Sequence, residues 1–311
     1  MAILIADKYE MWKKEAQERF DQLKANEEEL NRIFIDLYGL QDELDYKVDD
    51  KDISVSLADQ EREIRSLISY AVGCMFGRYS LDEEGLIFAG GMFDISRYSK
   101  FIPDKDNILL ITDEEYFEDG AIDITNRLIE FISTVYGPET LEENLLFISD
   151  TLGGAGTSRE VIRKYFIKDF YLDHLKIYKK RPIYWQFNSG KENGVKGLFY
   201  LHRYEENLLG RLKTDYLSKL NQVYNARIEQ REIQKQTSSN PRDIAKFEKE
   251  IQKINRQLKE LREFDEKIGH LSLKKIQLDL DDGVIVNYTK LQCDPDTNEK
   301  YTILSKGVKE L

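Results

Sequence analysis

A seven-residue repeat of apolar side chains in the last third of the chain constrains the fold more than any other feature. Two interleaved series run through this segment and are broken only where Asp265 takes a core position: Ile244, Ile251 and Leu258 form the first, and Phe247, Ile254, Leu261 and Ile268 form the second. A helix with such a seam must bury it against another helix. The preceding segment offers a partner, because a similar stripe recurs there at Leu217, Leu220, Tyr224 and Ile228.

These stripes predict an antiparallel coiled-coil hairpin over residues 205–270. Its turn falls at residues 237–240, with Asn240 as the N-cap of the second helix and Pro241 at the first helical position. At a rise of about 1.5 Å per residue the hairpin is about 35 to 45 Å long. Such an arm is either a spacer that braces an assembly or a hairpin that stabilises only itself, and the pattern fits both.

Helical periodicity also dominates the N-terminal part of the chain. Apolar residues recur at three- and four-residue steps from Asp7 to Tyr38, which predicts one long amphipathic helix ending at Gly39. Further helices are expected at about 59–79, at 124–136 and from 141 to 152, the last one opened by a capping box at Thr140.

Strand-like patterns fill much of the remaining chain. Short strands are expected at 86–89 and 108–111, a β-hairpin around residues 183–201, and a second hairpin where Asp282-Gly283 separates two alternating apolar runs. The fold class is therefore α+β, predominantly helical, with a mixed α/β segment and a coiled-coil hairpin. The expected division is an N-terminal helical segment at 1–80, the mixed segment at 81–204, the helical hairpin at 205–270 and a β-hairpin tail at 271–311.

The β-hairpin at residues 178–204 is surrounded by basic side chains. Cations at a strand-rich, aromatic segment are typical of a surface that contacts nucleic-acid phosphates, and amide side chains there could reach base edges. The predicted phosphate contacts are Lys179, Lys180, Arg181, Lys191, Lys196 and Arg203, and the predicted base contacts are Gln186, Asn188 and Asn193. The alternative for the cations is a solvated face with no further role.

Motifs for catalysis or metal binding are missing from the sequence. The glycine-rich stretch at 153–156 follows a helical pattern rather than a strand, and Thr157 with Glu160 forms a capping box, so the glycines are expected to link two helices. Asp279, Asp281 and Asp282 do not have the spacing of a calcium loop. We therefore assign no catalytic residue, no metal and no cofactor to this chain.

Charge restricts how the chain could meet DNA. The net charge of −12 argues against a protein that coats nucleic acid nonspecifically. Acidic residues gather where lysine is absent, at Asp113, Glu114, Glu115, Glu118, Asp119 and Asp123, and this stretch should avoid phosphate. Cys74 and Cys293 suggest neither a disulfide framework nor a metal site, and no segment predicts a membrane span, so the expected location is the cytoplasm.

Four ordered segments carry a family resemblance. The basic hairpin, the run Asn26–Ile35, the run Ile68–Ser80 and the run Leu278–Val284 together resemble the C-terminal half of PglX-type adenine-specific DNA methyltransferases of phage-defence (BREX) and related restriction–modification systems. In that family the methyl-transfer motif and the loop for S-adenosylmethionine lie upstream of the region resembled. The resemblance therefore implies that S-adenosylmethionine belongs to the parent enzyme and that this chain is inactive alone.

Two functions follow as hypotheses. The first is a non-catalytic DNA-specificity and scaffold region of an adenine-specific methyltransferase, with DNA and the catalytic region as partners. The second is a protein-interaction scaffold that docks onto the methyltransferase or another defence component without touching DNA.

Overall fold

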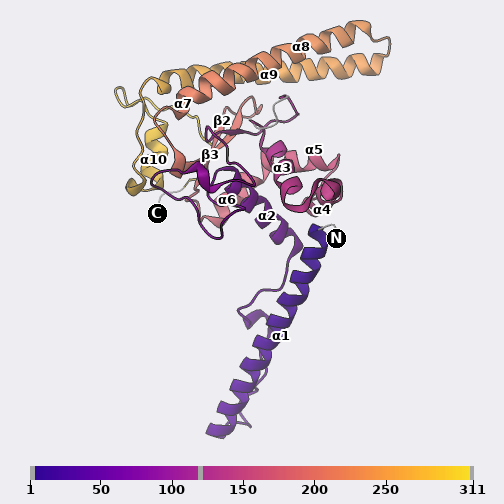
Figure 1. Ribbon diagram of the computed structural model, residues 1–311, viewed down its shortest axis with the longest axis vertical. Coiled ribbons are helices and arrows are strands. Elements are labelled where there is room, and N and C mark those ends of the chain that lie inside the picture. The colour runs from indigo at the N-terminus through magenta and orange to yellow at the C-terminus, as the bar shows by residue number, and fades with distance from the viewer. Residues whose placement is uncertain (1–3, 118–121, 309–311) are drawn as a thin grey trace.

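Two helical arms leave opposite sides of a body built around a small sheet (Figure 1). The computed structural model describes residues 4–117 and 122–308. The helices of the body are α2 (Gln60–Met75), α3 (Ile124–Tyr136), α4 (Leu141–Leu152), α5 (Ser158–Lys168), α6 (Phe170–Ile177), α7 (Leu208–Arg211) and α10 (Val284–Leu291). The arms are α1 (Ile5–Tyr38) and the pair α8 (Ser218–Thr237) and α9 (Pro241–Ser272). The predominantly helical α+β class is confirmed.

The sheet has three antiparallel strands in the order β1 (Leu109–Leu110), β3 (Lys196–Tyr200) and β2 (Tyr184–Asn188). The predicted hairpin is therefore present, with Trp185 opposite Phe199. A C-terminal stretch extends the sheet past β2, since the Asn188 amide donates to the carbonyl of Ile303 at 3.0 Å and the Ser305 amide donates to that of Gln186 at 2.8 Å. The edge of β2 is thus paired rather than exposed.

Both faces of the sheet are buried, each under a different set of helices. Alternation along β1 places Leu109 in a core built with α2 to α6 and places Leu110 in a core built with α7 to α10. Likewise Tyr184 faces the first core and Trp185 the second. Strands buried on both faces read as continuous apolar runs, as in Ile108–Ile111. The cores extend across the boundaries expected at residues 80, 204 and 270.

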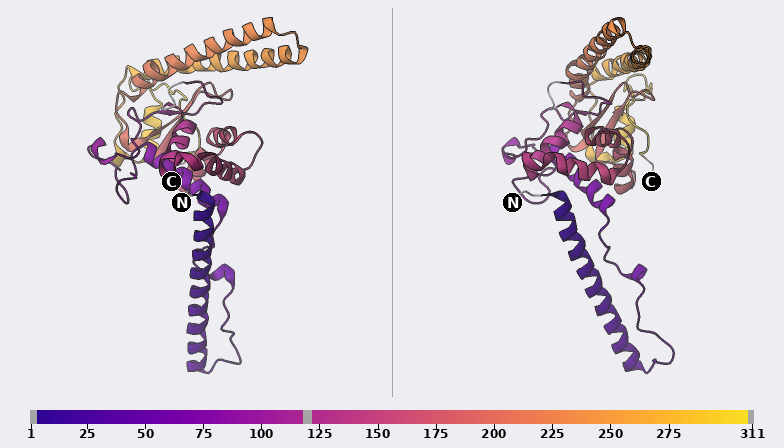
Figure 2. Two further views of the ribbon diagram at one scale, coloured as in Figure 1. Left: turned by 45° about the vertical axis from the view of Figure 1, so that its right-hand side comes forward. Right: turned by 90° about the vertical axis from the view of Figure 1, so that its right-hand side faces the viewer.

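The first arm matches its prediction closely. The α1 helix ends where expected, because Gly39 adopts the left-handed conformation (φ 68°) and its amide donates to the carbonyl of Asp36 at 3.3 Å. The helix starts at the body, where the Ile5 amide donates to Oδ1 of the buried Asn144 at 2.8 Å. From there it runs away from the body, and the chain returns alongside it (Figure 2).

The second arm is the predicted helical hairpin. Asn240 caps α9 by accepting from the amide of Arg242 at 3.1 Å, and Pro241 occupies the first helical position. Five of the seven predicted seam residues of α9 are buried, whereas Ile244 and Phe247 near the turn are half-buried; the buried ones are Ile251, Ile254, Leu258, Leu261 and Ile268. A π-helical stretch, Leu212–Leu217, joins α7 to α8. Across the described residues, every helix is too short or too polar to span a lipid bilayer.

Two expected β-structures are wrong. Residues 86–89 form no strand: Gly85 and Gly90 both have positive φ, and Phe88 is buried against the rings of Phe93 and Tyr200 without a pairing strand. The tail hairpin is also wrong, since residues 284–291 are helix α10.

Residues 284–291 form a helix because their apolar side chains also fit a helical period. Val284, Tyr288 and Leu291 lie on one face of α10 against the second core, and the Tyr288 ring meets Trp185 edge-on at 5.7 Å. The buried Asn287 fixes the start of this helix through hydrogen bonds to the backbone of Asp279. The Asp-Gly pair therefore ends a turn of 3₁₀ helix instead of closing a hairpin.

Of the two capping boxes predicted beside the glycine-rich stretch, one is present and one is not. The capping box at Thr157 is present, with the Glu160 amide donating to Oγ1 of Thr157 and the Thr157 amide donating to Glu160. The one at Thr140 is wrong, because its hydroxyl donates to the carbonyl of Tyr136 at 3.0 Å. The glycines link α4 to α5, as expected.

Candidate nucleic-acid interface

The aromatic residues of the β-hairpin lie inside the molecule. Trp185, Phe187 and Phe199 have no exposed surface, and the rings of Phe187 and Phe199 stack at 4.7 Å between centroids. Aromatic rings that bind single-stranded nucleic acid must be open to the bases. The hairpin therefore offers its ends, rather than its strands, to a partner.

One end of the hairpin carries three consecutive basic residues. Lys179, Lys180 and Arg181 connect α6 to β2, and all three side chains are exposed. Lys179 and Lys180 have positive φ (49° and 66°), and the Lys180 amide donates to the carbonyl of Leu175 at 2.7 Å, which terminates α6. Cations at the C-terminus of a helix also interact favourably with the helix dipole. The link is thus a fixed, exposed basic segment.

The other end of the hairpin is attached to the second arm. The Glu260 carboxylate of α9 accepts hydrogen bonds from the hydroxyl of Ser189 (2.6 Å) and from the amides of Glu192 and Gly194 (2.9 Å each). Lys191 in this turn is exposed, and Asn193 is half-buried with a left-handed backbone (φ 56°). A five-residue strand separates the two ends by about 17 Å, since each residue adds about 3.3 Å.

The remaining predicted contacts are occupied within the fold. Gln186 is buried and accepts from the hydroxyl of Ser305 at 2.6 Å, while Asn188 donates to the same hydroxyl at 3.1 Å. Lys196 donates to the carbonyl of Ile167 at 2.8 Å, and burial lowers the pKa of its ammonium group. Gln186 is thus enclosed by the fold, whereas Asn188 and Lys196 are half-buried and already have hydrogen-bond partners within it.

Arg203 is half-buried, and its guanidinium is bonded within the fold. Its guanidinium donates to the carbonyls of Phe76 (3.2 Å), Asp104 (2.9 Å) and Lys105 (3.2 Å), and it lies 3.9 Å from the ring centroid of Phe93. Burial lowers the pKa of this guanidinium. Arg203 therefore ties β3 to the loop before β1. The structure brings only Lys179, Lys180 and Arg181 together at one exposed site.

The acidic stretch docks onto the second arm. Asp113 forms an ion pair with Lys253 and accepts from Nε2 of Gln257 at 3.0 Å, and Glu114 pairs with Arg227 at 2.8 Å. Hydrogen bonds and the charge of Lys253 keep the pKa of Asp113 low even though burial opposes this. Glu118 and Asp119 lie outside the described residues. Part of the acidic stretch thus serves to hold α8 and α9 on the body.

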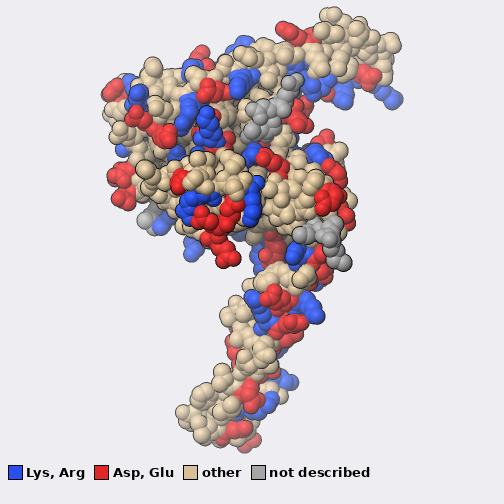
Figure 3. Space-filling view, viewed as in Figure 1, with Lys and Arg blue, Asp and Glu red and all other residues tan. Residues whose placement is uncertain are grey.

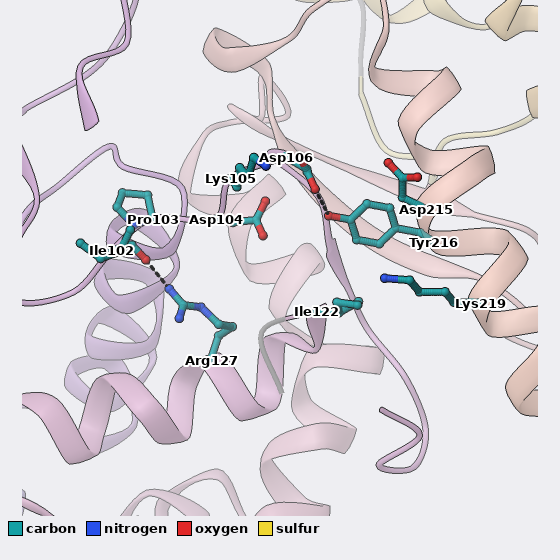
Figure 4. Close-up of a pocket in the computed structure, with 10 residues that line it drawn as sticks. All are labelled: Ile102, Pro103, Asp104, Lys105, Asp106, Ile122, Arg127, Asp215, Tyr216 and Lys219. Carbon is teal, nitrogen blue, oxygen red and sulfur yellow. Dashed lines mark hydrogen bonds between the residues drawn. The ribbon is translucent and has the colours of Figure 1, made fainter. Parts of the chain in front are cut away.

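A cleft of about 340 Å³ lies between the loop before β1 and the start of the second arm (Figure 4). Asp104, Asp106 and Asp215 line it together with Lys105 and Lys219. Burial raises the pKa of Asp104 to about 6. Tyr216 donates to Asp106 at 3.3 Å. Within residues 4–117 and 122–308, no group of three or more histidine, cysteine, aspartate or glutamate side chains is placed to hold a metal ion.

The glycine-rich stretch does not fit a site for S-adenosylmethionine. Such a loop normally leaves a strand and enters a helix, whereas Gly153 follows helix α4 directly. The side chain of Lys164 reaches back over the loop and donates to the carbonyl of Ala155 at 2.6 Å. We assign no step of methyl transfer to these residues.

Two known proteins are similar to nearly the whole of this chain or to most of it. The chain is 50% identical over 288 residues to the adenine-specific methyltransferase PglX of Lacticaseibacillus casei (strain Zhang). The matched residues make up 92% of this chain and 24% of that protein. The chain is related to a region of the PglX-type adenine-specific methyltransferases. It is also 42% identical over 241 residues to the adenine-specific methyltransferase BrxX of Escherichia coli O9:H4 (strain HS). That match covers 73% of this chain and 20% of the BrxX protein.

The chain thus spans about a quarter of the length of its PglX relative and a fifth of its BrxX relative. No protein-family model matches the chain. The relationship confirms the resemblance inferred from the four sequence segments.

One residue that holds the hairpin in place could not be identified from the sequence. Glu260 holds the turn of the β-hairpin against α9 through three hydrogen bonds, although nothing in the heptad pattern sets it apart from other solvent-side glutamates. The one sequence feature that could have indicated this contact is the glycine at position 194 of the turn. Gly194 lies so close to α9 that a Cβ atom there would stand 2.4 Å from the carbonyl oxygen of Gln257.

Proposed function

We propose that this chain is the non-catalytic specificity and scaffold region of an adenine-specific DNA methyltransferase in a phage-defence or restriction–modification system. The observation that carries the proposal is 50% identity along 92% of this chain to only a quarter of a PglX methyltransferase. A region of that kind would act in the cytoplasm with DNA and with the catalytic part of the enzyme. S-adenosylmethionine would bind to that catalytic part.

The proposed DNA contact is the exposed link formed by Lys179, Lys180 and Arg181. Phosphate binding requires cations that are solvent-exposed and fixed in position, and the link between α6 and β2 satisfies both conditions. Lys191 and Asn193, at the far end of the hairpin, would contact DNA only if the duplex followed the hairpin along its length. We leave Gln186 out of the contact surface because it is buried, and we leave out Asn188, Lys196 and Arg203 because they form hydrogen bonds within the fold.

Scaffolding is the second part of the proposal. Two loops at one end of the sheet attach α8 and α9 to the body: the β2–β3 turn bonds to Glu260, and the loop after β1 pairs through Asp113 and Glu114. An arm that is fixed at its base can hold a partner at a set distance. Basic and acidic side chains are interspersed over the face of the body seen in Figure 3. This mixed surface favours the alternative, a protein-interaction scaffold that does not touch DNA.

Binding of the purified chain to a short random duplex at low and moderate salt tests the proposal. Changing Lys179, Lys180 and Arg181 together to Glu should abolish salt-sensitive binding if these residues contact phosphates. Any binding that remains should have a slope of log affinity against log salt that is lower by about 3, since each phosphate contact contributes about 0.9. The matched control reverses the charge of Lys8, Lys13 and Lys14 on α1, which changes the net charge equally.

The outcomes separate a DNA contact at the link from a diffuse charge effect and from no DNA contact at all. Binding that the link variant abolishes and the α1 variant retains would support the DNA-specificity role. Equal loss in both variants would mean a diffuse effect of net charge. No binding by the unchanged protein at low salt would leave the protein-interaction scaffold as the function.

A further inference from the structure

The far end of the α1 arm carries an apolar stripe that nothing in the described chain covers. Leu30, Ile33, Phe34 and Leu37 are 54%, 51%, 53% and 71% exposed. Their spacing of i, i+3, i+4 and i+7 places them on one face of the helix. Four large apolar side chains together on one exposed face are typical of a surface that binds a partner. We call these four residues the distal stripe.

A different face of the same helical turns is already occupied. Glu28, Asn31 and Ile35 contact the returning segment 40–53: Glu28 accepts from the amide of Val48 at 3.2 Å, Asn31 donates to the carbonyl of Tyr46 at 3.2 Å, and Ile35 is buried. The Arg32 guanidinium lies 4.6 Å from the centroid of the Tyr46 ring. This packing keeps α1 helical to its end and leaves the distal stripe facing outward.

The distal stripe cannot be covered by the body. The arm meets the body near its start, where the Tyr9 and Phe147 rings lie 6.4 Å apart, and its far end stands away from the body in every view (Figures 1 and 2). The face of this end seen in Figure 3 is largely uncharged, with acidic side chains beside it. A partner must therefore come from outside the described chain.

Charge around the distal stripe defines the chemistry of that partner. Residues 26–52 contain ten acidic and three basic side chains, a net charge of −7. A phosphate backbone would be repelled there, and two copies of the arm would bring like charges together. The complementary surface is an apolar groove bordered by Lys and Arg, into which a helix inserts anchors at i, i+3, i+4 and i+7.

We propose that the distal stripe docks into such a groove on the part of a PglX-type methyltransferase that this chain does not match. About three quarters of the length of the PglX relative lies outside the matched region, so the partner surface is available there. The inference rests on the proposed function, because it takes the methyltransferase to be the assembly in which this region works. The arm then positions the rest of the enzyme, while the link at 179–181 contacts DNA.

Hydrogen exchange of residues 27–38 tests the docking. It is measured without DNA in the isolated chain and in a chimera, L. casei PglX with its matched region replaced by this chain. The stripe is expected to exchange at least tenfold more slowly in the chimera. The change Phe34→Ser with Leu37→Ser should return exchange in the chimera to the rate in the isolated chain. Leu146→Ser with Leu172→Ser, which alters two similarly exposed leucines on the body, should leave the protection intact.

A second measurement covers a chimera that does not fold. The tagged chain is co-expressed with L. casei PglX lacking its matched region, and the size of the captured complex is measured. A one-to-one complex that the Phe34/Leu37 variant loses and the Leu146/Leu172 variant keeps would support the proposal.

Equal exchange in chain and chimera, or no complex on co-expression, would overturn the docking. Protection of the isolated chain that increases with its concentration would overturn it in favour of a second copy. The DNA titration is a separate assay, so docking with no DNA binding would retain this inference and support the scaffold alternative, whereas DNA binding without docking would retain only the specificity role.

Discussion

A buried ion pair offers a sharp test of how the body is held together. Arg163 of α5 donates to the Asp123 carboxylate at 2.6 Å, and the two side chains are only 8% and 2% exposed. Arg163 also donates to the hydroxyl of Thr112 at 2.7 Å. Asp123 has a second role as the N-cap of α3, where it accepts from the amides of Thr125 and Asn126 at 2.9 and 3.2 Å. A single carboxylate thus connects α3, α5 and the end of β1.

Replacing Asp123 with Ala should destabilise the protein by about 4 to 6 kcal/mol. Leaving a buried guanidinium without its partner costs about 3 to 5 kcal/mol. Loss of the N-cap adds about 1 kcal/mol. The free energy of unfolding is measured by urea titration followed by circular dichroism. In the double variant Asp123→Asn with Arg163→Met, most of this loss should be recovered, because no charge is then buried.

The exposed pair Glu142–Arg159 provides a matched control. Its geometry is similar, with two hydrogen bonds at 2.8 and 2.5 Å, but its side chains are 71% and 45% exposed. Glu142→Ala should change stability little, since solvent screens such pairs. If Asp123→Ala lost no more stability than Glu142→Ala, the assignment of the buried pair as a structural connection would be wrong.

Three further predictions concern burial. Burial lowers the pKa of His174 to about 3 from 6.5, so between these pH values the imidazole binds a proton only in the unfolded chain. The free energy of unfolding should therefore decrease as the pH falls from about 6.5 toward 3. In His174→Asn the decrease between pH 7 and 5, measured by urea titration, should be smaller, and an equal decrease in both proteins would contradict this. Gly194→Ala should destabilise by about 1 to 3 kcal/mol because its Cβ would meet the α9 backbone at 2.4 Å, whereas Gly210→Ala, with no atom within 4 Å, should be neutral or stabilising by up to about 1 kcal/mol. Leu261→Ala should cost about 2 to 5 kcal/mol, while Ile233→Ala, 62% exposed on the same arm, should cost far less; equal thermal midpoints would refute the assigned seam.

Long helices were predictable because their periodicity extends over many turns and their ends carry specific caps. The Gly39 terminus of α1 and the Asn240 start of α9 both follow from local geometry that involves only neighbouring residues. Short elements were less predictable. A strand-like alternation is present at Val284, Val286 and Tyr288, yet this segment is helical because α10 packs against Trp185.

The candidate site was predictable only in part, for a physical reason. Charge and amide side chains are visible in a sequence, but their hydrogen-bond partners lie far along the chain. Arg203 finds the carbonyl of Phe76, 127 residues away, and Gln186 finds Ser305, 119 residues away. Lys179, Lys180 and Arg181 follow the end of α6, and all three residues are exposed.

The sheet that two cores share also limits how such a region can be recombined with its relatives. A crossover at residues 204–205 would join one parent's Trp185 and Phe199 to another parent's α7, α9 and α10, against which these rings pack. An exchange at that point would have to match the packing surfaces of both parents at once. Parents that exchange 108–304 as one unit keep this second core intact, so the smallest segment that can be exchanged without disturbing that core is larger than the hairpin itself.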